Sequence, residues 1–138
     1  MVLNETLRLY PPIILMLRTA ENEMRLGGDD EMGDVVIPAG TELLMPVLMW
    51  HHEAKYWGPD ADEFRPDRFE GGVAKACLVT GTFLPFSTGP RVCIGQGFAM
   101  LEAKTVLATI LRRFRFRVSP LYRHAPITMV TMQPQFGL

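Results

Sequence analysis

The chain has 138 residues, of which 48% are hydrophobic, and its formal net charge at pH 7 is −1. This length suffices for one modest domain with a core, and charges of both signs are interspersed, which argues against a nucleic-acid-binding surface or a polybasic membrane patch. The two cysteines do not form a disulfide framework, no apolar run reaches about 18 residues as in a transmembrane helix, and the first residues do not form a signal peptide.

The first third of the chain predicts one helix followed by short strands. Val2 to Tyr10 are expected to be helical, and Pro11-Pro12 end this helix because proline lacks an amide donor and disfavours helical backbone in the preceding residue. Short apolar segments within residues 24–45 then predict a small antiparallel sheet. The segments are separated by glycine and proline turns, at Gly27-Gly28 and Pro38-Ala39-Gly40. Residues 47–52 are expected to form one or two helical turns.

Residues 56–81 show little periodicity and contain several helix and strand breakers, so a long irregular segment is predicted there. Trp57, Phe64 and Phe69 are expected to pack this segment onto the rest of the protein.

Residues 96–113 predict the clearest helix of the chain. Its apolar residues fall within an arc of about 140° on a helical wheel, which predicts a core-facing side. They are Ala99, Met100, Ala103, Val106, Leu107, Ile110, Leu111 and Phe114. Phe98, Leu101 and Ala108 lie off the arc, so a second buried side is expected.

The last residues predict strands. Phe114, Phe116 and Val118 alternate with polar residues as in a half-buried strand. Residues 127–132 and 135–138 are expected to form a closing hairpin about Gln133-Pro134.

Cys93 lies in the loop Phe86-Ser87-Thr88-Gly89-Pro90-Arg91-Val92-Cys93-Ile94-Gly95, which leads directly into the predicted helix 96–113. A thiol near a helix N-terminus with an arginine beside it ionises readily. Gly89 and Gly95 allow a tight turn and leave room for a large flat ligand. Without further context, Cys93 would instead be a small buried hydrophobe, which is the commonest state of a free cysteine.

This loop has the pattern F-x-x-G-x-R-x-C-x-G and resembles the cysteine-ligand loop of the cytochrome P-450 superfamily. The resemblance implies haem b as cofactor, with the Cys93 thiolate as axial ligand of the iron. It also implies that Arg91 binds a haem propionate, that Arg18 does the same, and that Phe86 packs on the thiolate side. The alternative for Arg91 is an arginine that only stabilises the loop.

A second motif of the same family is Glu5-Thr6-Leu7-Arg8, and Arg68 fits the P-x-R-F element of the family in Pro66-Asp67-Arg68-Phe69. By spacing alone, Glu5 and Arg8 share one helical face and would form a solvated ion pair. The resemblance implies instead a buried charge cluster of Glu5, Arg8 and Arg68, with a structural and not a catalytic role.

The resemblance implies a fold that is mainly α with small antiparallel β-sheets (α+β), of which this chain would be the C-terminal haem-binding portion. Residues 1–138 would then be part of one domain about three times longer. Its parts would be the E-x-x-R helix 1–10, the small sheet 24–45, the meander 56–81, the cysteine loop 86–95, the helix 96–113 and the closing strands 114–138. The distal proton-delivery helix and the N-terminal membrane anchor are expected to lie upstream.

The implied activity is that of a monooxygenase that inserts one oxygen atom of O2 into a hydrophobic small molecule. Reducing equivalents would come from NADPH through a reductase, and the full-length protein would lie on the cytosolic face of the endoplasmic reticulum membrane. Trp57-Gly58-Pro59-Asp60-Ala61 and the run from Cys93 to Lys104 resemble plant members, which oxidise fatty acids, hormones or terpenoids. The isolated chain is not expected to be active alone.

Two further readings remain open. One is a related haem-thiolate isomerase or dehydratase, although such branches tend to carry an altered cysteine loop and the spacing from Gly89 to Cys93 is intact. The other is a truncated, non-catalytic product.

For several further residues, both a functional site and a purely structural role are possible. His51 and His52 are adjacent, and adjacent residues rarely converge on one metal ion, so structural histidines are expected. Cys77 is expected to stay a reduced thiol. Residues 13–16 and 129–132 correspond to stretches that line the substrate pocket in the family, with core packing as the alternative.

Overall fold

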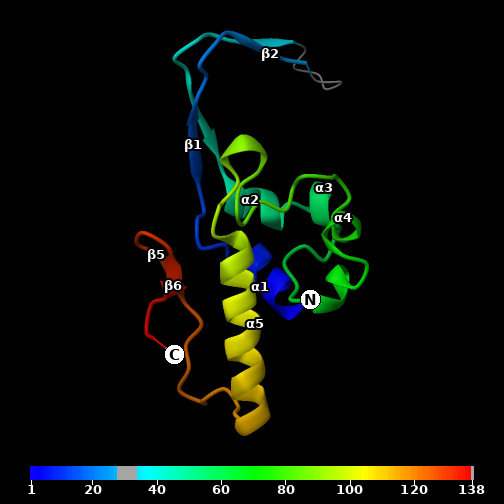
Figure 1. The fold of residues 1–138 in the computed structure, drawn as a ribbon, viewed down its shortest axis with the longest axis vertical. Coiled ribbons are helices and arrows are strands. Elements are labelled where there is room, and N and C mark those ends of the chain that lie inside the picture. The colour runs from blue at the N-terminus through cyan, green and yellow to red at the C-terminus, as the bar shows by residue number, and fades with distance from the viewer. Residues whose placement is uncertain (28–33, 138) are drawn as a thin grey trace. The chain divides into compact units, whose positions relative to one another are not determined.

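The computed structural model describes residues 1–27 and 34–137, and the chain divides into two compact units (Figure 1). One unit comprises Met1–Ile14 together with Val47–Leu138, and the other is Leu15–Pro46. All described helices lie in the larger unit, and all described sheets are small and antiparallel. The chain is therefore of the α+β class, as predicted.

Helix α1, Val2–Leu9, begins the larger unit. Its buried face consists of Glu5, Arg8 and Leu9, so two of its three buried residues are charged. The backbone leaves the helical region at Tyr10, with φ −130° and ψ 62°, directly before the proline pair. The helix therefore ends one residue before the predicted Tyr10, because a residue that precedes a proline is disfavoured in helical backbone.

The described residues of the smaller unit form two separate two-stranded sheets, which corrects the prediction of one sheet over 24–45. Strand β2, Met24–Leu26, pairs with β3, Val35–Ile37, and strand β4, Glu42–Met45, pairs with β1, Met16–Thr19. Strand β1 was not predicted, because a four-residue segment is too short for its sequence to indicate a strand without knowledge of the strand that pairs with it. Residues 28–33 of the predicted sheet lie outside the described residues.

Four short helical elements follow: α2, Val47–His52, α3, Ala54–Trp57, η1, Pro66–Phe69, and α4, Val73–Ala76. Residues 56–81 are thus only partly irregular, because three single-turn helices fall in or overlap them. None of these elements is long enough to be stable alone, so their order comes from tertiary packing.

The core of this region is aromatic. Trp57 and Phe69 are buried together with Ala61 and Ala76, and Phe83 packs against them at ring distances of 6.1 Å from Trp57 and 5.2 Å from Phe69. Phe64 was expected in this cluster, but its side chain is 51% exposed. That part of the prediction is wrong, since backbone groups of the segment next to it, and not an aromatic ring, face the interior.

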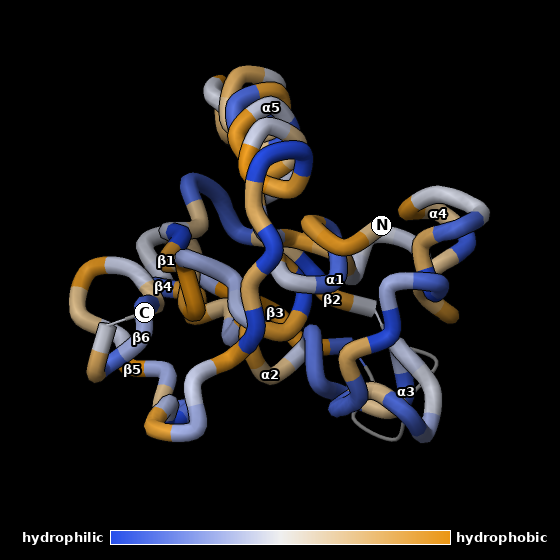
Figure 2. The backbone as a smooth tube through the Cα atoms, turned by 90° about the horizontal axis from the view of Figure 1, so that it is seen from below, coloured by the Kyte–Doolittle hydropathy of each residue, from blue (hydrophilic) through white to orange (hydrophobic). Residues whose placement is uncertain are grey.

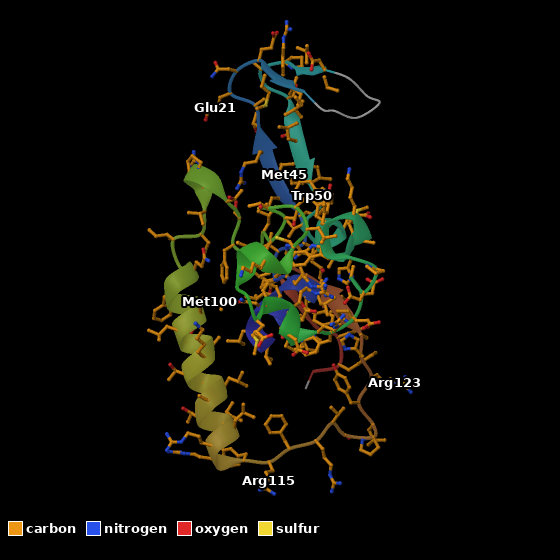
Figure 3. The ribbon with its side chains drawn as sticks, turned by 90° about the vertical axis from the view of Figure 1, so that its right-hand side faces the viewer. Glu21, Met45, Trp50, Met100, Arg115 and Arg123 are labelled. Atoms are coloured by element: carbon orange, nitrogen blue, oxygen red, sulfur yellow. The ribbon has the colours of Figure 1, made fainter. Side chains whose placement is uncertain are left out.

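Helix α5 spans Gln96–Arg113, the bounds predicted from its periodicity. None of its residues is buried, and Phe98 is 72% exposed. The residues that are half-buried all belong to the predicted apolar arc; they are Ala99, Met100, Ala103 and Leu107. Hydrophobic and hydrophilic residues follow one another along the helix, and side chains project from it on several sides (Figures 2 and 3).

The expected burial of α5 on two sides is therefore wrong for this chain. An apolar face is buried only when another element covers it, and within residues 1–27 and 34–137 only part of one face is covered.

Residues 114–118 do not form the predicted strand, since no described strand pairs with them. The closing hairpin exists, but its strands are β5, Pro126–Thr128, and β6, Met132–Pro134. The turn therefore lies at residues 129–131, and Gln133-Pro134, which were predicted as the turn, belong to β6. Leu138 lies outside the described residues.

Candidate functional site: a buried charge cluster and an exposed cysteine loop

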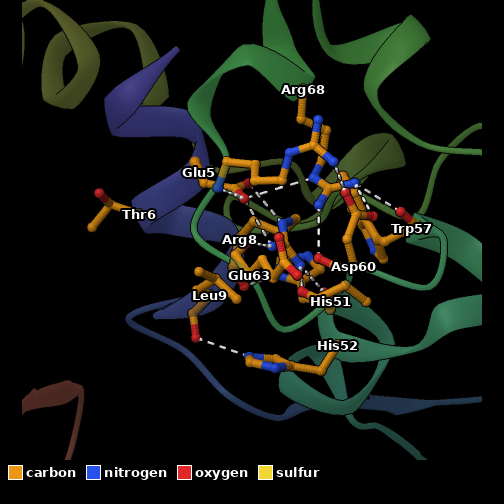
Figure 4. A network of polar contacts seen from close by, with 12 residues as sticks. Glu5, Thr6, Arg8, Leu9, His51, His52, Trp57, Asp60, Glu63 and Arg68 are labelled. Carbon is orange, nitrogen blue, oxygen red and sulfur yellow. Dashed lines mark hydrogen bonds and ion pairs between the residues drawn. The ribbon is translucent and has the colours of Figure 1, made fainter.

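The Glu5 carboxylate and the Arg8 guanidinium form a bidentate pair on the buried face of α1 (Figure 4). Arg8 Nε donates to Glu5 Oε2 at 2.7 Å, and Arg8 Nη2 donates to Glu5 Oε1 at 2.9 Å. Both side chains are fully buried, at 0% exposure. The spacing of three residues therefore produces a desolvated pair and not a solvated one.

Arg8 also binds three backbone carbonyls from distant segments. Its Nη1 donates to the carbonyl oxygens of His51 and Ala61, and its Nη2 donates to that of Glu63, at 2.6, 2.5 and 3.1 Å. The guanidinium also lies over the Trp57 ring, 5.1 Å from its centroid. One side chain of α1 thereby organises residues 51–63, which have no sheet or long helix of their own.

Arg68 approaches Glu5 from η1. Its Nε lies 3.6 Å from Glu5 Oε1, which is an ion pair but not a hydrogen bond, and this Nε is buried without a hydrogen-bond partner among the described residues. The other two nitrogens bind the end of α3 and the loop after it: Nη1 donates to the Trp57 carbonyl at 2.8 Å, and Nη2 donates to the Asp60 carbonyl at 2.9 Å. The three residues named by the sequence motifs thus lie together.

Asp60 is a fourth charged member that the sequence motifs did not indicate. Its carboxylate accepts from Arg68 Nη1 at 3.1 Å and pairs with Arg65. The hydrogen bond from Arg68 and the charge of Arg68 hold the pKa of Asp60 below its ordinary value. The sequence does place an acid eight residues before Arg68. In a segment without regular structure, however, spacing along the chain does not show whether two side chains point toward each other.

The environment keeps Glu5 ionised. Burial by itself would raise the pKa of Glu5, but the hydrogen bond from Arg8, the 2.8 Å hydrogen bond from the Arg65 backbone N–H, and the charges of Arg8 and Arg68 outweigh it. The pKa of Glu5 therefore lies below its usual 4.5. The cluster is a charged hub at neutral pH.

The two adjacent histidines have different partners. The His51 ring is fully buried: Nδ1 donates to the Arg8 carbonyl at 2.9 Å, and Nε2 accepts from the Leu84 backbone N–H at 2.9 Å. These partners assign the neutral tautomer with the proton on Nδ1. His52 contacts the Asp62 carboxylate at 2.7 Å and the Leu9 carbonyl at 3.1 Å. Within the described part of the chain, no group of three or more His, Cys, Asp or Glu side chains could hold a metal ion.

Cys93 is the exposed end of a tightly turned loop. The short helix η2, Gly89–Arg91, precedes it, and its backbone N–H donates to the Phe86 carbonyl at 2.8 Å. The Cys93 carbonyl accepts from Gln96 N–H at 3.2 Å, so the cysteine begins the tight turn that leads into α5. Gly89 and Ser87 have positive φ values of 68° and 64°. This turn is favourable for Gly89 and strained for Ser87.

The other predicted cofactor contacts lie in different places. Arg91 is exposed on η2, and Phe86 is half-buried at the start of the loop. Gly95 is the N-cap of α5. Arg18 lies on β1 in the smaller unit and donates to the Leu17 carbonyl at 3.0 Å.

Of the two stretches expected to line a substrate pocket, 129–132 makes a backbone hydrogen bond to the residue just before the other, 13–16. Met132 N–H donates to the Pro12 carbonyl at 2.9 Å, which connects the hairpin of β5 and β6 to the segment after α1. Ile13 and Met129 beside this contact are exposed.

Comparison with known proteins agrees with these features. The chain matches the family model "Cytochrome P450" over residues 1–136. Its relatives include cytochrome P450 72A15 of Arabidopsis thaliana, 49% identical over 137 residues, and two proteins of Catharanthus roseus, 7-deoxyloganic acid hydroxylase and secologanin synthase 1, which are 50% and 52% identical over the same length. The chain belongs to the cytochrome P450 family, and its predicted similarity to plant members is confirmed.

Each alignment covers 99% of this chain but 25 to 26% of the relative, so the chain spans about a quarter of the length of the relatives it matches. No described helix has the length and apolar character needed to cross a membrane.

Membership of this family implies haem as cofactor, and the residues around Cys93 fit that group. A haem iron accepts a cysteine thiolate as axial ligand, and the Cys93 thiol is exposed. A Cβ atom added to Gly95 would lie 3.8 Å from Cys93 Sγ, so glycine leaves that side of the sulfur open. Ile94, Phe98 and Leu101 beside it expose apolar surface suited to a macrocycle.

Proposed function

We propose that this chain is the C-terminal, cysteine-ligand portion of a plant cytochrome P450 monooxygenase that acts on a hydrophobic small molecule of the fatty acid, hormone or terpenoid class. The observation that carries the proposal is Cys93: an exposed thiol at the start of the turn that leads into α5, with Gly95 as the glycine next to its sulfur. One relative is named 7-deoxyloganic acid hydroxylase, and this name supports oxygen insertion as the reaction type.

In this proposal Cys93 would supply the axial thiolate, and bound haem with that ligand would supply oxygen activation. Arg91 and Arg18 would each bind a propionate through paired hydrogen bonds, because a planar guanidinium matches a carboxylate. Phe86 would shield the thiolate side from water, and Gly89 and Gly95 would leave room for the macrocycle.

The cluster of Glu5, Arg8 and Arg68 would have a structural role. It binds backbone carbonyls from His51 to Glu63, and in the proposal residues 56–81, which begin within this segment, are the meander that supports the cysteine side of the cofactor. Residues 1–10, 24–45, 86–95, 96–113 and 114–138 would be the other parts of the same domain.

The remaining partners follow from the proposed reaction. Reducing equivalents would come from NADPH through a reductase, and the full-length protein would lie on the cytosolic face of the endoplasmic reticulum, held by a segment outside these residues. The uncovered apolar face of α5 supports the proposal that catalysis needs further sequence to cover it.

The test adds haem to the purified chain and records the difference spectrum of the reduced, carbon-monoxide-bound form. A red-shifted band typical of thiolate ligation is expected, if not in the chain alone then in a chain extended upstream with the corresponding segment of a relative. Cys93→Ser should abolish this band, because an alcohol does not replace a thiolate. Cys77→Ser is the matched control and should retain it.

Retention of the thiolate band by Cys93→Ser would overturn the assignment. Absence of any thiolate band in both lengths of the chain would favour a non-catalytic product. Turnover of an organic hydroperoxide without reductase or NADPH would favour an isomerase or dehydratase.

A further inference from the structure

His51 connects two parts of the molecule that the motifs treat as separate, the charge cluster of α1 and the cysteine loop. One ring nitrogen donates to the carbonyl of Arg8, and the other accepts the backbone N–H of Leu84. Both bonds are 2.9 Å long and the imidazole is fully buried, so water cannot replace either partner.

The Leu84 end of this connection leads to Cys93 through backbone hydrogen bonds. The Leu84 carbonyl accepts from Ser87 N–H at 3.1 Å, and the carbonyl of Phe86, two residues on from Leu84, accepts from Cys93 N–H at 2.8 Å. The position of Leu84 therefore affects the backbone turn that presents the sulfur.

Ring contacts hold the imidazole in one orientation. His51 stacks on Phe83 with a centroid distance of 5.7 Å and an interplanar angle of 22°, and it meets Trp57 edge-on at 6.0 Å. Phe83 directly precedes Leu84. The His51 ring therefore contacts the segment that enters the loop twice, by stacking on Phe83 and by a hydrogen bond to Leu84.

We propose that His51 is a positioning residue for the Cys93 thiolate, holding the chain segment that enters the cysteine loop to the charge cluster through its neutral, Nδ1-protonated ring. The effect of His51 on haem ligation rests on the proposed function. The link from Arg8 through His51 to Leu84 does not, because it rests on the two hydrogen bonds of the ring.

Two amide substitutions separate the two bonds. The His51→Asn side chain places its amide nitrogen as many bonds from Cα as Nδ1, so it keeps a donor for Arg8 and loses the acceptor for Leu84. The His51→Gln side chain places its amide oxygen as far out as Nε2, so it keeps an acceptor for Leu84. His52→Gln is the matched control, because His52 binds Leu9 and Asp62 and not the loop.

The first measurement is hydrogen exchange at the Leu84 amide, which needs no haem. His51→Asn should speed this exchange at least about tenfold, the factor expected when one buried hydrogen bond is lost, while His51→Gln and His52→Gln stay close to the original protein. Equal exchange in His51→Asn and His51→Gln would overturn the proposal.

The second measurement is the fraction of bound haem with the thiolate-type spectrum, taken at equal haem content. It should fall in His51→Asn and be restored in His51→Gln. Phe69→Leu weakens the same core through Trp57 and Phe83 but removes neither hydrogen bond of His51, so it should lower haem-loaded protein without lowering this fraction. A loss in Phe69→Leu equal to that in His51→Asn would reduce His51 to a general stabilising role and contradict the proposal.

If His51→Asn does not fold, the ring nitrogens of the original protein decide the question. Their 15N chemical shifts should report a neutral ring protonated on Nδ1, and protonation on Nε2 would overturn the proposal. If the original protein shows no thiolate spectrum, the proposed function fails, and the exchange data still decide whether His51 holds Leu84.

Discussion

Arg8 donates a hydrogen bond to each carboxylate oxygen of Glu5, from Nε to Oε2 at 2.7 Å and from Nη2 to Oε1 at 2.9 Å, and both side chains are fully buried. An ion pair of this kind gains little over a well-packed apolar pair, because both charges were desolvated to form it. Its value here is organisational, since the same guanidinium also fixes the carbonyls of His51, Ala61 and Glu63. Loss of one member is therefore costly.

Arg8→Lys is expected to lower the free energy of unfolding by about 3 to 5 kcal/mol, because lysine keeps the charge but leaves carbonyls of His51, Ala61 and Glu63 without donors. A lysine ammonium is a point charge with three donors and cannot reproduce the five hydrogen bonds of Arg8. Urea unfolding followed by circular dichroism measures the change. Arg112→Lys, exposed near the end of α5, is the control and should change stability by less than about 0.5 kcal/mol. Equal effects of the two would contradict the hub role of Arg8.

Arg68→Ala is expected to cost about 2 to 3 kcal/mol, because it strands the carbonyls of Trp57 and Asp60 and removes a charge beside Glu5. Arg65→Ala provides the contrast. Its side chain is 52% exposed against 9% for Arg68, although both pair with Asp60, so a loss below about 1 kcal/mol is expected. Thermal and urea unfolding of the two variants give the comparison. A larger loss for Arg65→Ala would show that the exposed arm of the cluster carries the stability.

Acid should destabilise the protein in two separate steps. Burial lowers the pKa of His51 from 6.5 to about 4. Between pH 6.5 and pH 4, His51 is therefore protonated in the unfolded chain and neutral in the folded chain. The contribution of His51 is therefore complete above pH 6.5 and is lost as the pH falls to 4, a change of about 3 kcal/mol. The lowered pKa of Glu5 adds a second loss below pH 4.5.

Unfolding free energies at several pH values from 7 to 4 test the first step. His51→Gln does not titrate, so its stability should change much less over this range than that of the original protein. Parallel curves for both proteins would mean that another group causes the acid sensitivity.

Two glycines of the cysteine loop are expected to respond differently to alanine. Gly89 has a φ of +68°, which costs a residue with a Cβ about 1 to 2 kcal/mol, whereas Gly95 has a φ of −83° that any residue adopts. A Cβ at Gly95 would lie 3.8 Å from Cys93 Sγ, an ordinary contact. Gly89→Ala should therefore destabilise the loop and Gly95→Ala should not, as measured by hydrogen exchange of the Cys93 amide. The reverse order would show that access to the sulfur, and not backbone conformation, is the tighter constraint.

Local patterns account for what the sequence determined by itself. The bounds of α5, Gln96–Arg113, follow from apolar periodicity, and the end of α1 follows from Pro11. The joint face of Glu5 and Arg8 follows from a spacing of three residues. Each of these three features depends on residues that are close together in the sequence. Such local interactions do not depend on the rest of the fold.

Only the tertiary structure decided the rest, because the partners lie far apart along the chain. Arg8 and the carbonyl of Glu63 are 55 residues apart, and His51 and Leu84 are 33 apart. No pattern in the sequence marks a backbone carbonyl as the partner of a guanidinium, or β1 as the partner of β4. The burial of a side chain is likewise a property of what covers it, which is why the periodicity of α5 predicted its helix and not its exposure.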